Sequence, residues 1–98
     1  MTWFDLPTPV VIAHRGDSMH APENTLAAFR LAAENGADAI EFDVKLTADG
    51  EVIALHDRTL DRTTDGHGEV HRFTLAALQE LDAGSWFDER YRGERIPT

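Results

Sequence analysis

The sequence predicts an α/β fold, and three observations carry the prediction. A short apolar run covers residues 10–13, residues 22–36 carry helix signals, and residues 40–47 alternate strictly between apolar and polar side chains. A continuous apolar run fits a strand buried on both faces, and period-two alternation fits a half-buried strand. The 98 residues are 42% hydrophobic and 28% charged, which suffices for one domain with a modest core.

The first strand is expected to end at Ala13, because polar residues and Gly16 follow the apolar run. A helix is expected next, with Pro22 near its start and Gly36 just past its end. Its apolar face is formed by residues spaced three and four apart, namely Leu26, Phe29 and Ala33.

The segment from residue 40 to residue 56 allows two arrangements. If Asp49 and Gly50 form a two-residue hairpin turn, residues whose numbers sum to 99 face each other, which sets Asp43 opposite His56. One face is then aliphatic, and the other carries Glu41, Asp43, Lys45 and His56. In the alternative, residues 45–51 are a return loop between parallel strands, which also brings these carboxylates and His56 together.

Residues 57–73 are rich in Thr, Asp and Gly, which predicts turns with a short strand at residues 69–73. A second helix is expected over "TLAALQELDAG", with Thr74 as N-cap and Gly84 as a stop. Leu75, Leu78 and Leu81 form its apolar face.

Composition excludes several classes of function. A formal charge of −9 argues against binding to nucleic acid, and the absence of cysteine excludes disulfides, zinc thiolate sites and cysteine nucleophiles. No apolar run approaches about 18 residues, and the N-terminus lacks the features of a signal peptide. We therefore expect a soluble, cytoplasmic protein without stable membrane insertion.

Glu41 and Asp43 form the most informative pair of charges. Two carboxylates on one strand face repel each other unless a cation lies between them, and oxygen ligands favour magnesium, calcium or manganese. A solvent-facing polar strand explains the same pattern without a metal.

His14 and His56 each close an apolar strand, at the position where sheets and barrels place their chemistry. Arg15 can grip an anionic oxygen, and two histidines beside a metal-held phosphate suit acid and base roles in hydrolysis. Taken alone, a His-Arg pair at a strand end is more often a surface or capping feature.

An ordered series of motifs then supplies a resemblance. "HRG", "PENT", "EFDVKLTADGEVIALHD", "LDRTT", "LDAGSWF" and "IPT" extend from about Val10 to Thr98. Together they resemble the N-terminal part of the catalytic domain of the glycerophosphodiester phosphodiesterase family. The resemblance implies a TIM (β/α)8 barrel that hydrolyses glycerophosphodiesters to sn-glycerol 3-phosphate and an alcohol, in lipid and glycerol metabolism, with a divalent cation, Mg or Ca.

Carried onto this sequence, the resemblance implies that His14 and His56 are the acid/base pair. Arg15 would contact the substrate phosphate, and Glu41 and Asp43 would be metal ligands. The resemblance also favours the parallel arrangement of residues 40–56. Residues 1–56 would then hold the first three barrel strands and the first helix, and residues 57–98 an insertion subdomain.

A barrel of this type needs about 250 residues, and the family takes a further glutamate ligand from a later strand. We therefore expect a chain that ends before the rest of the barrel. Its uncovered strand edges would favour a homo-oligomer. A non-catalytic module for binding or assembly is the alternative from another class, and a phospholipase D of the sphingomyelinase type is the alternative enzyme.

Overall fold

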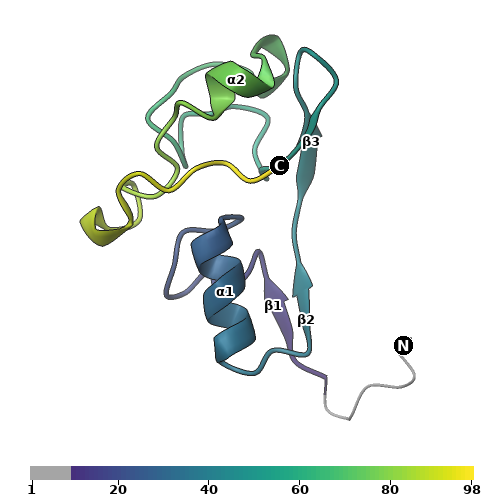
Figure 1. Ribbon diagram of the computed structural model, residues 1–98, viewed down its shortest axis with the longest axis vertical. Coiled ribbons are helices and arrows are strands. Elements are labelled where there is room, and N and C mark those ends of the chain that lie inside the picture. Colours follow the sequence, from purple (N-terminus) through teal and green to yellow (C-terminus); the bar gives the residue numbers. More distant parts are fainter. Residues whose placement is uncertain (1–9) are drawn as a thin grey trace.

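The computed structural model describes residues 10–98. The expectation that the N-terminus is not a signal peptide concerns residues outside this range. The molecule is flat and elongated, with extents of 41 × 30 × 17 Å. Figure 1 shows two lobes, with α1, β1 and β2 in one and α2 in the other. The chain passes from the first lobe to the second where β2 is followed by β3.

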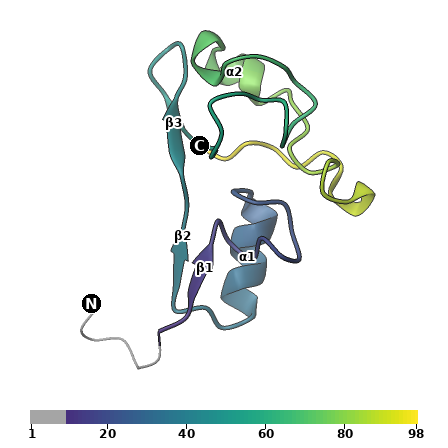
Figure 2. The ribbon, with the colours of Figure 1, turned by 180° about the vertical axis from the view of Figure 1, so that it is seen from behind.

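The first lobe is a βαβ unit. Strand β1 (Ile12–His14) pairs in parallel with β2 (Ala39–Glu41), and helix α1 (Leu26–Glu34) connects them. Figures 1 and 2 show α1 beside the two strands. The predicted α/β class is confirmed, but the expected burial of the first strand on both faces is wrong. Ile12 is 52% exposed, since β1 has one neighbouring strand within residues 10–98.

Helix α1 begins later than predicted and buries a different face. Thr25 caps it, because the Thr25 hydroxyl accepts a hydrogen bond from Ala28 N at 3.2 Å. The buried residues are Ala28 and Ala32, whereas Leu26 of the predicted face is 47% exposed. A Cβ on Gly16 would lie 2.7 Å from the Ala28 carbonyl carbon, so the helix approaches the loop after β1 too closely for large side chains.

The strand predicted over residues 40–47 is interrupted after Glu41. Residues Val44–Leu46 form β3, which pairs with β4 (Val52–Ala54) in an antiparallel hairpin. The parallel arrangement favoured by the resemblance is therefore wrong. Residues 10–56 contain four short strands in two separate sheets, where three barrel strands were expected.

The hairpin itself was expected, but its register is shifted by one residue. Val44 faces Ala54, so that facing residue numbers sum to 98 (44 + 54) and not to 99. The loop holds three residues, because Thr47 N donates to Glu51 O at 2.9 Å and Gly50, with φ of +81°, donates to Thr47 O. Such a loop closes with a residue in the left-handed region, and the extra residue changes every cross-strand pair.

This register reverses the predicted faces of the hairpin. The backbone of Asp43 accepts a hydrogen bond from Leu55 N at 3.0 Å, so Asp43 lies opposite Leu55 and not opposite His56. Ile53 and Leu55 are buried, whereas β3 and the first residue of β4 expose their aliphatic side chains: Val44, Leu46 and Val52 are 52–60% exposed. The predicted pairs of Leu46 with Ile53 and of Val44 with Leu55 are therefore wrong, since Leu46 faces Val52 and Val44 faces Ala54.

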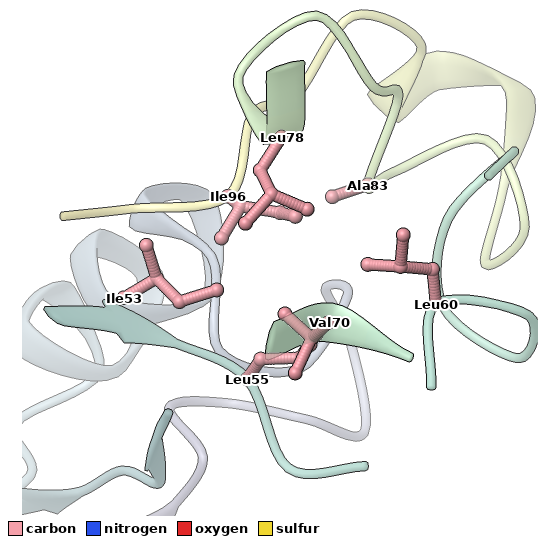
Figure 3. Packing of buried hydrophobic residues seen from close by; sticks show 7 residues of the cluster. All are labelled: Ile53, Leu55, Leu60, Val70, Leu78, Ala83 and Ile96. Atoms are coloured by element: carbon pink, nitrogen blue, oxygen red, sulfur yellow. The ribbon is translucent and has the colours of Figure 1, made fainter. Parts of the chain in front are cut away.

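The hydrophobic core lies in the second lobe. Figure 3 shows its side chains converging from β4, the following loops and the C-terminal segment: Ile53, Leu55, Leu60, Val70, Leu78, Ala83 and Ile96. The cluster includes residues on both sides of the predicted boundary between residues 56 and 57. That boundary stays a prediction.

Helix α2 (Leu75–Leu78) confirms the second helix, although it is shorter than expected. Thr74 caps it as predicted, and the Thr74 hydroxyl accepts a hydrogen bond from Ala77 N. Leu78 is fully buried, with Leu75 and Leu81 packed against the core.

The strand predicted at residues 69–73 is wrong. These residues instead form the 3₁₀ turn η2 (Val70–Arg72), closed by a hydrogen bond from Phe73 N to Val70 O. A second such turn, η3 (Glu89–Tyr91), follows. Within residues 10–98, none of the helices is long and apolar enough to cross a membrane.

The C-terminal segment makes two polar contacts with the first lobe. Glu94 Oε1 accepts a hydrogen bond from Ala27 N at 2.9 Å, at the start of α1. The Tyr91 hydroxyl donates to His20 O at 2.9 Å, in the loop before α1. The C-terminal segment therefore anchors the region where the predicted site residues lie.

The contact between Gly16 and Ala28 gives the first prediction. Gly16→Ala combines a left-handed backbone, with φ of +79°, and a clash with the Ala28 backbone, so we expect a loss in unfolding free energy of about 3 kcal/mol. Gly50→Ala is the matched control, since Gly50 has φ of +81° but nothing within 4 Å of the added Cβ. It should cost about 1 kcal/mol. Urea denaturation measures both, and equal losses would contradict the packing argument.

Candidate active site

The parallel register of β1 and β2 places two predicted site residues side by side. His14 and Glu41 are direct partners at the strand ends, and His14 Nε2 lies 3.6 Å from Glu41 Oε2. Both side chains remain accessible, with exposed fractions of 65% and 40%. An imidazole and a carboxylate thus meet at the carboxyl ends of parallel strands, where α/β folds commonly bind ligands.

Arg15 is held in an unusual backbone conformation. It has φ of +58°, which for a residue with a side chain costs about 1 kcal/mol or more. Two hydrogen bonds support it: Arg15 N donates to Glu41 O at 2.7 Å, and Arg15 O accepts from Asn24 N at 3.0 Å. Strain of this kind is often found at functional sites.

The guanidinium of Arg15 lies between two carboxylates. Its Nε is 3.2 Å from Asp43 Oδ2, and its Nη1 donates to Glu23 Oε2 at 3.2 Å. The side chain is 20% exposed, so part of it can still be reached by a ligand. The predicted Arg15 and Asp43 are therefore in contact.

Asn24 and Glu23 are site residues that sequence reasoning missed. Asn24 is 3% exposed, has φ of +55°, and donates from Nδ2 to Asp43 Oδ2 at 3.2 Å. The signal is present in "PENT", a motif that indicates the start of a helix and contributes to the family resemblance. The motif also delivers a carboxylate and an amide to the site.

His56 belongs to a second group of charges. Its Nδ1 lies 2.8 Å from Asp57 Oδ1, and both Asp57 oxygens accept hydrogen bonds from Arg62, at 2.9 and 3.0 Å. Arg62 also donates to both oxygens of Glu23 at 2.9 Å. Asp57 and Arg62 were not predicted as site residues.

The two groups are joined through Glu23. The members of this chain of contacts are, in order, Asp43, Arg15, Glu23, Arg62, Asp57 and His56, and the sign of the charge alternates from Asp43 to Asp57. Within residues 10–98, His56 has no ion pair with His14, Glu41 or Asp43. The expected direct meeting of Asp43 and His56 is therefore replaced by an indirect connection.

The charged groups in this chain shift the pKa of two members. Hydrogen bonds from Arg62, and then the contact with His56, hold the pKa of the Asp57 carboxyl well below its usual range. Asp57, and then Glu23, raise the pKa of the Arg62 guanidinium further. Both groups therefore stay ionised at neutral pH.

The site contains oxygen atoms of the kind that bind hard divalent cations. Glu41 Oε1 and Asn24 Oδ1 are buried without a hydrogen-bond partner in the part of the chain that the structure describes. Such oxygens are suited to Mg²⁺ or Ca²⁺. No group of three or more His, Asp or Glu side chains gathers around a common point within residues 10–98. The role of Glu41 and Asp43 as metal ligands stays a prediction.

Comparison with known proteins decides the family. Residues 14–98 match the sequence model of the "Glycerophosphoryl diester phosphodiesterase family". The chain belongs to this family.

Relatives in this family are similar along most of the chain. The chain is 60% identical over 89 residues to a glycerophosphodiester phosphodiesterase of Caldanaerobacter subterraneus, and 48% identical to glycerophosphodiester phosphodiesterase 1 of Rattus norvegicus. These matches cover 91% and 89% of this chain but 37% and 27% of the relatives. The chain therefore spans about a third of the length of the curated relatives it matches.

Solved structures of the same family agree with the fold. A phosphodiesterase of Oleispira antarctica, in complex with the product sn-glycerol-3-phosphate, has a TM-score of 0.90 at 52% identity, over 92% of this chain and 36% of that one. A glycerophosphodiester phosphodiesterase of Agrobacterium tumefaciens has a TM-score of 0.88 at 49% identity, over 90% and 38%. The lobes of this chain thus match one part of a larger fold.

The lowered pKa of Asp57 predicts a change of stability with pH. A carboxyl whose folded pKa lies below its unfolded pKa stabilises the fold fully above the unfolded value, and this contribution is lost as the pH falls through the folded pKa. Asp57→Asn should therefore lower the unfolding free energy by about 1 kcal/mol at pH 7, where the partly exposed ion pair is intact.

The difference between wild type and Asp57→Asn should shrink steadily as the pH falls from about 5. Denaturant unfolding at several pH values measures this difference. Arg62→Gln removes the main cause of the shift and should produce the same trend. A difference that stays constant down to pH 2 would rule out the assigned ion pair as its origin.

Proposed function

We propose that this chain forms part of a catalytic domain that hydrolyses glycerophosphodiesters to sn-glycerol 3-phosphate and an alcohol. The observation that carries the proposal is the meeting of His14, Glu41 and Arg15 at the ends of β1 and β2. Membership of the family and the product complex of the Oleispira relative support the same substrate class.

The corresponding fold proposal is the N-terminal portion of a TIM barrel with an insertion subdomain. It is supported by the βαβ unit of the first lobe and by the TM-score of 0.90 over 36% of the Oleispira structure. Active sites of TIM barrels lie at the carboxyl ends of the strands, which agrees with the position of His14 and Glu41.

Arg15 is the proposed phosphate ligand. Its guanidinium is largely buried and carries several N–H groups in a fixed plane, an arrangement that matches phosphate oxygens. Its strained backbone is held by β2 and by Asn24, so the side chain starts from a defined position. A charge that is already oriented stabilises the extra negative charge of a phosphoryl transition state.

His14 and His56 are the proposed acid and base. If Nδ1 of His56 carries the proton that it shares with Asp57, Nε2 is left free to accept a proton from a nucleophile. His14 can donate to a leaving alkoxide through its accessible ring.

Glu41 and Asp43 are the proposed ligands of the divalent cation, Mg²⁺ or Ca²⁺. When bound, such a cation neutralises charge on the phosphate oxygens. The buried, unpartnered Oε1 of Glu41 is the feature of this chain that supports the assignment. Arg15 and Asn24 orient the Asp43 carboxylate from one side.

A second candidate is a module for binding or assembly. Apolar side chains on β1 and just after β2 are half exposed, with Ile12 at 52% and Phe42 at 56%. Such surfaces favour association with another chain, and self-association into a homo-oligomer is the proposal here. Analytical ultracentrifugation tests it, and a monomer at all concentrations would contradict it.

Hydrolysis of glycerophosphocholine tests the enzymatic proposal. We would assay this chain and a longer chain in which the remaining length of the Caldanaerobacter relative follows Thr98. His14→Ala and His56→Ala should each lower the rate by about 10² to 10⁴ in whichever form is active. His67→Ala is the matched control, since His67 lies in an exposed loop and pairs with Asp61. Equal activity of His14→Ala and the control, or hydrolysis by neither form, would sink the proposal.

Cation binding has its own test. Titration of the chain with Mg²⁺ or Ca²⁺, followed by NMR shifts of the Glu41 and Asp43 carboxylates, should show saturable binding. Glu41→Gln should weaken it by about tenfold or more, because the loss of one carboxylate charge reduces attraction for the ion. Glu51→Gln, at an exposed position directly after the hairpin loop, is the control and should leave binding unchanged. Identical binding by both variants would contradict the assignment.

A further inference from the structure

Arg62 occupies a central position that the proposed mechanism does not use. Its guanidinium forms a fork on each of two carboxylates. Nη1 and Nη2 donate to Glu23, and Nε and Nη2 donate to Asp57, at distances of 2.9 to 3.0 Å. Four of its five N–H groups can be accounted for in this way. Most of the hydrogen-bonding capacity of Arg62 is therefore used by these two carboxylates.

The two carboxylates held by Arg62 each contact a proposed active-site residue. Glu23 contacts Arg15, and Asp57 contacts His56. Glu23 is the critical one, because its side chain is 10% exposed and its charge is poorly screened by water. A poorly screened anion beside Arg15 competes with any anionic ligand for the same guanidinium.

The distances show how this competition is resolved. Arg62 donates to both Glu23 oxygens at 2.9 Å, whereas Arg15 reaches one oxygen at 3.2 Å. Arg15 also faces Asp43, so without Arg62 it would lie between two uncompensated carboxylates. Arg62 supplies a second positive charge beside Glu23, and so weakens the attraction of Glu23 for the Arg15 guanidinium.

We propose that Arg62 is a positioning residue: by neutralising Glu23 it keeps Arg15 available for a phosphate, and by fixing Asp57 it orients the His56 ring. This inference rests on the proposed role of Arg15 as phosphate ligand. The region has a further restraint, since the Arg62 guanidinium lies 5.9 Å from the centre of the Trp86 ring. Trp86 donates from Nε1 to Ala83 O and so ties Arg62 to the core of the second lobe.

The binding of inorganic phosphate to the 98-residue chain tests the proposal by calorimetry. Arg62→Gln should weaken binding by about tenfold, since Glu23 would then neutralise Arg15. The double variant Glu23→Gln with Arg62→Gln should restore binding to nearly the wild-type value, because the competing anion is removed as well. Arg58→Gln is the matched control, an exposed arginine four residues away in the same loop, and should leave the affinity unchanged.

Rescue separates positioning from direct contact. If Arg62 touched the phosphate itself, neutralising Glu23 would not restore the lost affinity, and absence of rescue overturns the proposal. Absence of phosphate binding by the wild-type chain overturns it too, together with the role of Arg15. Arg62→Lys keeps the positive charge but cannot form the paired hydrogen bonds of the guanidinium. We therefore expect a phosphate affinity between those of wild type and Arg62→Gln, with a His56 ring that is no longer held in one orientation.

The His56 ring provides a spectroscopic readout that a merely structural role would not move. In wild type, ¹⁵N NMR should show a single resonance for Nδ1 in a hydrogen bond to Asp57, and Arg62→Gln should broaden or shift it while the amide spectrum stays folded. An unchanged Nδ1 resonance overturns the proposal, even if the histidine variants confirm hydrolysis. Loss of phosphate affinity with rescue supports it, even if neither chain hydrolyses the substrate.

Discussion

Glu23 is the carboxylate on which the arrangement of this molecule depends. It is almost buried, it lies just before α1, and it contacts Arg15 from the first lobe and Arg62 from the second. A buried charge of this kind is stabilising only while its partners remain, because removal of one leaves an uncompensated ion in a poorly screened place. The same carboxylate thus connects the lobes and contacts the proposed phosphate ligand.

Close backbone packing supports this electrostatic arrangement. Gly16 lies against Ala28, which brings the start of α1 to the loop that carries Arg15. The left-handed conformations of Arg15 and Asn24 are held by hydrogen bonds between the two segments and to β2. A site that needs several strained residues in fixed positions has to be held by well-packed neighbours. Here the small residues of α1 provide that packing.

The hydrophobic core and most of the proposed site residues lie in different lobes, and polar contacts connect the two lobes. The hydrophobic cluster is contributed by β4 and later segments, whereas His14, Arg15 and Glu41 lie in the βαβ unit. Glu94 and Tyr91 attach the C-terminal segment to the region around α1. Residues 57–98 therefore have a role beyond filling space, since they supply Arg62 and hold the loop that presents the site residues.

Local patterns determined which elements form and which residue types gather. The apolar run and the Thr74 cap correctly indicated a strand and a helix, because these features depend on neighbours in the sequence. The alternation of residues 40–47 also indicated strand structure, which the fold divides into β2 and β3. The placement of His14 at a strand end followed from the same patterns and agrees with the bounds of β1, whereas the patterns placed Glu41 near the beginning of a longer strand and not at the end of β2. Their chemical roles stay predictions.

Only the tertiary structure decided the register of the hairpin, the buried face of α1 and the partners of His56. The same sequence fits a hairpin loop of two residues or of three. The longer loop shifts the register by one residue, which places Leu55 opposite Asp43 in place of His56. The face of α1 was decided by the approach of Gly16, and the contact between Glu23 and Arg62 joins residues 39 positions apart. Such long-range contacts depend on how the lobes pack, which no local pattern encodes.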